Sequence, residues 1–101
     1  MGKGERVKII KIIAKSEKGK LALEHHVAES VTLARKKKLM FKMLGYKQDI
    51  ISQEPYGIEI TLTNKHYQAL VRSEDVIREI SRALGENGAI ADRDYFYEVT
   101  E

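Results

Sequence analysis

The 101-residue sequence predicts a single, mostly helical α+β domain. Three observations support this prediction. Lysines recur at helical spacing in residues 4–19, two short stretches alternate around a turn with proline and glycine, and an apolar stripe with helical spacing follows Ser73. Apolar residues make up 43% of the chain, which is enough for one small core.

The first expected element is a helix over residues 4–19. Its β-branched residues favour a strand. Its lysines, however, fall on one face of a helix: Lys8, Lys11, Lys15 and Lys18. In a strand Lys8 and Lys11 would point to opposite faces, and neither face would be cleanly apolar. Gly19 is expected to end this helix.

Two further helices are expected, from residue 20 to about 30 and over residues 32–44. One unbroken helix over residues 20–44 would be roughly 37 Å long at ~1.5 Å per residue, which is too long for so small a core. Val31 and Thr32 supply a break, and Ser30 can cap the helix that follows.

The next stretch predicts a hairpin behind this helix. After Gly45, "KQDIISQ" and "GIEITLT" alternate as two strands around the turn at residues 54–57. Asn64 can cap a short helix, and "SEDVIREISRAL" predicts another from Ser73 to Leu84. The tail at residues 93–99 has the alternation of a strand.

The charge is divided unevenly along the chain. Residues 1–50 hold 13 Lys/Arg against 5 Asp/Glu, a net +8, and residues 51–101 hold 5 against 10, a net −5, so the total is +3. A basic half favours a polyanionic partner, although the two halves can also pair within the fold. The chain has no cysteine and no long apolar segment, so we expect a cytoplasmic protein. Charged residues make up 33% of the chain, which suits a thermophile, although a Lys/Glu-rich mesophile fits nearly as well.

The order of three helices, a hairpin and further helices predicts a winged helix-turn-helix with a two-stranded wing and a C-terminal helix. "ERVKIIKIIAKSEKG", "LGYKQDIIS" and "YGIEITLTNKHYQAL" resemble the first helix, the first wing strand and the second wing strand of MarR/PadR-like and archaeal winged-helix transcriptional regulators. The resemblance implies a winged-helix domain over residues 1–72. Residues 73–101 would add a helix and tail to the same domain, which could serve dimerisation. His66 and Lys37 depart from the family pattern.

This resemblance implies a homodimeric regulator that binds double-stranded DNA with the helix at 32–44. On that helix Thr32, Arg35 and Lys36 would face the bases, since arginine and lysine can donate to guanine and threonine can contact a thymine methyl. Lys38 and Lys42 would contact phosphates. On the wing, Gln53 and Tyr56 could donate hydrogen bonds, although Glu54 would repel phosphate.

The sequence indicates neither an enzyme nor a metal or cofactor site. It has no glycine-rich phosphate loop, no cysteine nucleophile and no recognisable serine elbow. His25 and Glu29 are four residues apart, but the adjacent His25 and His26 diverge by about 100° on a helix and cannot bind one ion together.

A second interpretation stays open. If residues 6–14 form a strand, the order becomes strand, long helix, hairpin, helix, strand, which is a ferredoxin-like βαββαβ sandwich. The tail strand at residues 93–99 favours it, because the winged-helix scheme leaves that strand unused. The function would then be that of an oligomeric binding or regulatory module for RNA or a small ligand.

Overall fold

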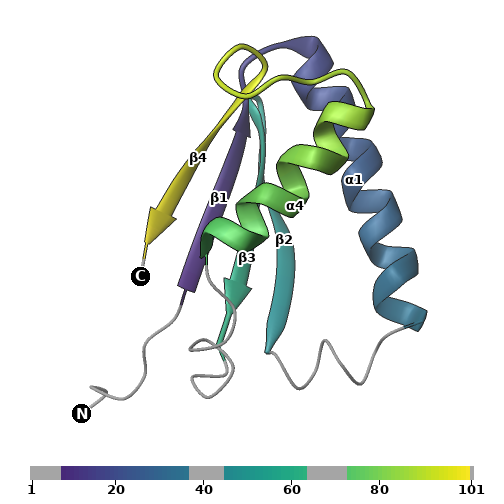
Figure 1. Ribbon diagram of the computed structural model, residues 1–101, viewed down its shortest axis with the longest axis vertical. Helices are drawn as coiled ribbons and strands as arrows, with labels where there is room; N and C mark the ends of the chain where they lie inside the picture. The colour runs from purple at the N-terminus through teal and green to yellow at the C-terminus, as the bar shows by residue number, and fades with distance from the viewer. Residues whose placement is uncertain (1–7, 37–44, 64–72, 101) are drawn as a thin grey trace.

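The chain forms an antiparallel sheet packed against two helices in a computed structural model that describes residues 8–36, 45–63 and 73–100 (Figure 1). For residues 31–36, 46 and 73 only the backbone is described. The elements are β1 (Lys8–Ala14), α1 (Glu17–Lys36), β2 (Tyr46–Gln53), β3 (Tyr56–Leu62), α4 (Ser73–Glu86) and β4 (Tyr95–Thr100).

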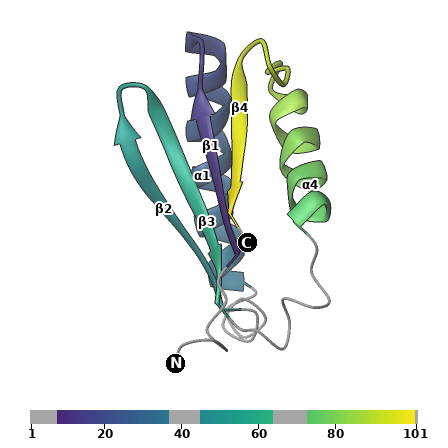
Figure 2. The same ribbon diagram turned by 90° about the vertical axis from the view of Figure 1, so that its left-hand side faces the viewer.

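The four strands lie in the order β2-β3-β1-β4, and every neighbouring pair is antiparallel. Both helices pack on the same side of the sheet (Figures 1 and 2). The observed order of elements is strand, helix, hairpin, helix, strand. This is the βαββαβ order of the ferredoxin-like alternative.

The prediction of a mostly helical winged helix-turn-helix is therefore wrong. The four-stranded sheet contradicts it, because a winged helix needs three short helices before the hairpin, and the described residues hold one strand and one helix there. The hairpin and the helix at Ser73 do form. The short helix predicted after Asn64 lies outside the described residues.

The predicted helix at residues 4–19 is strand β1 at its centre. β1 lies inside the sheet and pairs with β3 on one side and β4 on the other. Ile10 and Ile12 are buried toward the helices, whereas Ile9 and Ile13 lie on the other side of the strand. The lysine spacing was misleading because a strand can also hold a lysine at position 11. There Lys11 lies between Glu59 and Glu98 on the two neighbouring strands, and these opposite charges suit one another.

The predicted helix boundaries at Gly19 and at Val31–Thr32 are also wrong. α1 runs unbroken from Glu17 to Lys36, so Gly19 lies in its first turn and Thr32 in its interior. Its 20 residues correspond to about 30 Å. Buried Ala22 and Leu23, with half-buried Val27, attach α1 to the sheet through its first half.

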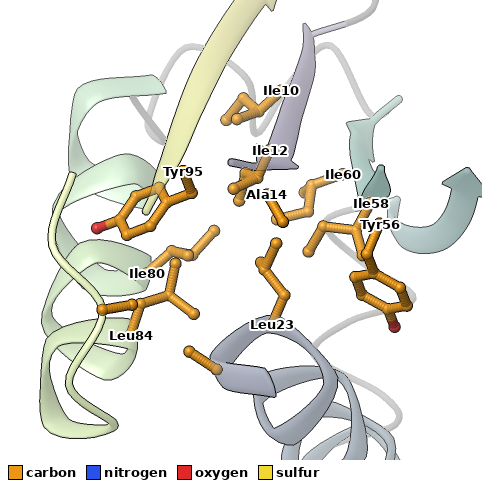
Figure 3. Packing of buried hydrophobic residues seen from close by; sticks show 12 residues of the cluster. Ile10, Ile12, Ala14, Leu23, Tyr56, Ile58, Ile60, Ile80, Leu84 and Tyr95 are labelled. Atoms are coloured by element: carbon orange, nitrogen blue, oxygen red, sulfur yellow. The ribbon is translucent and has the colours of Figure 1, made fainter. Parts of the chain in front are cut away.

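One hydrophobic core fills the space between the sheet and the helices (Figure 3). The strands contribute alternate residues to it, as expected for a sheet with one face covered. α1 contributes Leu23, and α4 contributes Ile80 and Leu84. The fully buried large side chains are Tyr95, Ile10, Ile12, Leu23, Ile58, Ile60 and Leu84. The covered face of the sheet is therefore the structural face.

Asp94 connects the start of α1 to the chain that enters β4. Its carboxylate is 5% exposed and accepts hydrogen bonds from Ser16 Oγ at 2.7 Å, from the Ile90 amide at 2.8 Å and from the Arg93 guanidinium at 2.7 and 3.0 Å. Ser16 Oγ also accepts the Gly19 amide at 3.1 Å and so caps α1. The Arg93 guanidinium, with the bonds from Ser16 and Ile90, holds the pKa of Asp94 well below its usual range.

Gly19 allows the backbones of α1 and the β4 entrance to come this close. A Cβ atom at Gly19 would lie 1.9 Å from the Asp94 carbonyl oxygen and 2.8 Å from its carbonyl carbon. That carbonyl also accepts the Lys15 amide at 2.7 Å, so it cannot move aside without losing a hydrogen bond. The position requires glycine for space.

We expect Gly19→Ala to lower the free energy of unfolding by about 3 kcal/mol, because the methyl group would separate two backbones. Gly85→Ala is the matched control, since a Cβ atom there meets nothing within 4 Å and alanine favours the helix by about 0.5 kcal/mol. Urea unfolding measures both variants. Equal stability of the two variants would contradict the close approach at Gly19.

We expect Asp94→Asn to lower stability at neutral pH and to leave a flatter stability–pH curve. Folding lowers the pKa of Asp94. Its contribution to stability is therefore complete at pH values above the pKa of an aspartate in the unfolded chain, about 4, and is lost progressively as the pH falls below that pKa. The difference between wild type and Asp94→Asn should therefore shrink on acidification. Asp92→Asn, an exposed neighbour, is the control, and a constant difference between wild type and Asp94→Asn would contradict the assignment.

Candidate functional site: the open face of the sheet

The candidate site is the face of the sheet that points away from α1 and α4, here called the open face. None of the described helices or strands covers it. The strand pairing fixes its residues as alternate positions in β1, β3, β4 and the first half of β2. In the second half of β2 the pairing shifts, so that Ser52 is the partner of Gly57 and the unpaired Ile51 lies near the same glycine. From β2 to β4 the residues of the open face are Lys47, Asp49, Ile51 and Ser52, then Gly57, Glu59 and Thr61, then Ile9, Lys11 and Ile13, then Phe96, Glu98 and Thr100.

An apolar strip crosses all four strands of the open face. Ile13 is the register partner of Gly57 on β3 and of Phe96 on β4. Gly57 has no side chain, and a Cβ atom there would lie 2.8 Å from Ile13 Cδ1 and 3.7 Å from Ile51 Cγ1. The irregular pairing between Ile50 and Ser52 accompanies this arrangement at β2. Ile51, at 43% exposed, Ile13 and Phe96 thus form one continuous strip, here called the apolar strip.

A row of charged residues runs beside the apolar strip. It reads Asp49, Glu59, Lys11 and Glu98 from β2 to β4, since these residues are register partners across the three strand pairs. Lys11 and Glu59 are half-buried at the centre, whereas Asp49 and Glu98 are exposed at the two edges. The row carries three acids and one base and is here called the charged row.

The open face is thus suited to protein contact and poorly suited to nucleic acid. Phe96 is its one aromatic residue among the positions given above, so it offers no series of stacking platforms for bases. The three carboxylates of the charged row would repel phosphate. Apolar side chains on an otherwise polar sheet are typical of a surface that another protein covers.

The residues predicted to bind DNA that the structure describes fall into two groups. Thr32, Arg35 and Lys36 belong to the last turns of α1, with only their backbone described. Lys38 and Lys42 lie outside the described residues.

Gln53 and Tyr56 flank the β2–β3 turn at the opposite end of the molecule from the end of α1 (Figure 1). Tyr56 is 5% exposed and belongs to the core, so its ring faces the helices. Burial, with a smaller effect of Glu24, raises the pKa of its hydroxyl. The turn itself contains a cis peptide bond between Glu54 and Pro55.

A polar hollow of about 460 Å³ lies at this same end. Its walls come from the β1–α1 turn and the β2–β3 turn and include Lys15, Ser16 and Glu54. Lys15 Nζ donates to the Asp92 carbonyl at 2.5 Å, and Ser16 Oγ is engaged by Asp94 and Gly19. These polar groups serve the fold, and nothing in their arrangement points to a ligand.

Comparison with protein families, curated proteins and solved structures gives no match. Function must therefore be inferred from the surface of the molecule itself. In the part of the chain described, no three His, Asp or Glu side chains gather as a metal site, and His25 Nε2 lies 3.5 Å from the Glu29 carboxylate. Neither described helix has the length and apolar character needed to cross a membrane. A cytoplasmic location stays a prediction.

The open face was missed at the sequence level, although β1 contains a signal for it. In "KIIKIIA" isoleucines occupy both the even and the odd positions. A strand with one face in water alternates apolar and polar residues, whereas a strand covered on both faces is apolar throughout. Because the lysine spacing favoured a helix, the isoleucines on both faces of a possible strand were not recognised as a sign of two covered faces.

Proposed function

We propose that this protein is a binding module that associates with a second copy of itself through the open face. The apolar strip is the observation that carries the proposal. It crosses all four strands, so a second sheet laid on this face would cover it at every strand. Half-buried Ile9 adds a further apolar side chain on the other side of the charged row. Stacked sheets of this kind pack about 10 Å apart with interdigitating side chains.

The charges of the open face favour a second copy over a nucleic-acid partner. The charged row contains Lys11 next to carboxylates, so one copy can supply both members of an ion pair to the other. A nucleic acid would meet mainly repulsion from the same row. Self-complementarity is what a two-fold contact between identical chains requires.

The size of the face indicates a modest affinity. Four strands at a spacing of about 4.8 Å and six residues at ~3.3 Å give roughly 400 Å² in projection per copy. Side chains that stand off the plane increase the accessible area above this value. The total lies at the low end for specific interfaces, so we expect a reversible equilibrium between monomer and dimer.

We expect the wild-type chain to dimerise reversibly at micromolar concentrations, as measured by sedimentation equilibrium. The double variant Ile13→Thr/Phe96→Thr should weaken dimerisation by at least about tenfold, because the centre of the apolar strip becomes polar. Both side chains are half-buried in the monomer, so the variant should lose some stability, and thermal unfolding at low concentration should show that it still folds.

The matched control is Leu21→Gln/Ile90→Thr. Leu21 and Ile90 are 56% and 55% exposed and lie away from the open face, on α1 and before β4. Dimerisation should be unchanged in this variant. A monomeric wild type at all concentrations, or an equal loss in the control, would refute the proposal.

Nucleic-acid binding is a second candidate function, at a different place. β1 begins with Lys8, β2 carries Lys47 near its start, and α1 ends at Arg35 and Lys36, all at the lower end of the molecule in Figure 1. Lysine and arginine gathered at one end suit contact with phosphates. This surface replaces the recognition helix that the sequence predicted.

The test is the affinity for a random DNA duplex titrated with salt. We expect Arg35→Ala/Lys36→Ala to weaken binding about tenfold and to reduce the salt slope by up to about 2, because each phosphate contact contributes about 0.9. Lys18→Ala/Lys20→Ala, at the opposite end of α1, is the control. No binding at low salt, or an equal effect of the control, would remove this candidate.

A further inference from the structure

We infer that the two copies stack about a two-fold axis that runs along the strands between β1 and β3. Each strand then runs in the same direction as its equivalent in the partner, here called the parallel arrangement, and Lys11 and Glu59 are the residues that select it. The inference rests on the proposed self-association and adds its geometry. The order β2-β3-β1-β4 places β3 and β1 at the centre of the sheet, so an axis between them gives the largest overlap.

Full overlap of two such faces allows two directions for the axis. An axis across the strands, level with the charged row, would lay each strand on its own copy. Lys11 would face the partner's Lys11, and Glu59 would face the partner's Glu59. The edge positions Asp49 and Glu98 would likewise face themselves, so every contact in the charged row would be repulsive. Like charges in an interface cost several kcal/mol.

An axis along the strands exchanges β1 with β3 and β2 with β4. Lys11 then faces the partner's Glu59, and Glu59 faces the partner's Lys11, which gives two opposite-charge contacts at the centre. Asp49 faces the partner's Glu98 at the two rims. Both rim residues are exposed, and Asp49 has Lys47 Nζ at 3.9 Å, so solvent and this neighbour screen the rim.

The apolar strip also matches in this arrangement. Ile51 faces the partner's Phe96, which joins the two edges of the strip. At the centre the Ile13 side chain already lies over the buried Gly57 of its own chain. Ile13 of each copy faces the partner's Gly57, so the two Ile13 side chains meet at the axis.

The direction of the axis has a consequence for the whole dimer. Rotation about an axis along the strands keeps the strand direction, so equivalent ends of the two copies lie at the same end of the dimer. The two ends of α1 that carry Arg35 and Lys36 would thus lie at the same end of the dimer, on its two outer sides. The other axis would place them at opposite ends.

Charge reversal tests the selecting pair. Lys11→Glu and Glu59→Lys should each weaken homodimerisation by at least about tenfold, because each variant places like charges at both central contacts. An equimolar mixture of the two variants should form heterodimers. In these the introduced glutamate faces the introduced lysine, and the native Glu59 of one chain faces the partner's Lys11. The charge-exchanged double variant should return to wild-type affinity.

Cross-linking tests the axis without altering the apolar strip or the charged row. The chain has no cysteine, so Lys47→Cys/Thr100→Cys carries the two reactive thiols of the experiment, at edge positions of one row that face each other between the two copies in this arrangement. The two positions lie on opposite edge strands, roughly 14 Å apart in one chain at three strand spacings. A bis-maleimide linker shorter than this distance should yield covalent dimers of the double variant and few of either single variant.

Three outcomes separate the direction of the axis from self-association itself. A wild-type chain that never dimerises would refute both. If the wild type dimerises but the double cysteine variant gives no more covalent dimer than either single variant, self-association stands and the parallel arrangement is overturned. The charge-exchanged double variant gives a second test. If its homodimerisation is as weak as that of the single reversals, although its thermal unfolding equals that of wild type, the parallel arrangement is likewise overturned.

Discussion

The structure depends on the pairing of β1 with two neighbours at once. β1 is the first described strand, yet it holds β3 on one side and β4, the last strand, on the other. The four-stranded sheet is therefore complete only when the last strand, β4, has paired with the first. Ile10 and Ile12 at this central position hold the core between the sheet and both helices. The same strand carries Ile9 and Ile13 on its opposite side, so it determines the core and the open face together.

The end of the molecule at which β1 turns into α1 is held by polar contacts. Asp94 accepts bonds from Ser16, Ile90 and Arg93, and its own carbonyl accepts the Lys15 amide. One residue before β4 thus completes the network that starts α1. Tyr97 adds a second polar contact on the helix side, where its hydroxyl meets Ser81 on α4 and lies 3.4 Å from the Ile77 carbonyl. These contacts orient both helices on one face and leave the other face open.

The different character of the two faces supports a binding protein. The covered face provides the stability of a small domain. The open face carries a second set of apolar side chains that stay partly exposed to water in the monomer, which is typical of a binding surface. The uneven charge of the chain also acquires a structural meaning. Among the described residues, the basic residues of the first half of the chain other than Lys11 are divided between the two ends of α1, about 30 Å apart: Lys15, Lys18 and Lys20 belong to the end at which α1 starts, and Lys8, Arg35, Lys36 and Lys47 to the end at which it finishes.

Short-range patterns in the sequence were sufficient to predict three local elements. These are the hairpin around Pro55, the helix that starts at Ser73 and the strand in the C-terminal tail. Turn residues, capping residues and alternation act over a few positions, and the structure follows them there. The state of β1 and the length of α1 depend instead on long-range packing. "KIIKIIA" fits a helix by its lysines and a strand by its isoleucines, and pairing with β3 and β4 makes it a strand. The charged row was beyond prediction for the same reason, because Asp49, Glu59, Lys11 and Glu98 form a row only once the strands stand in register.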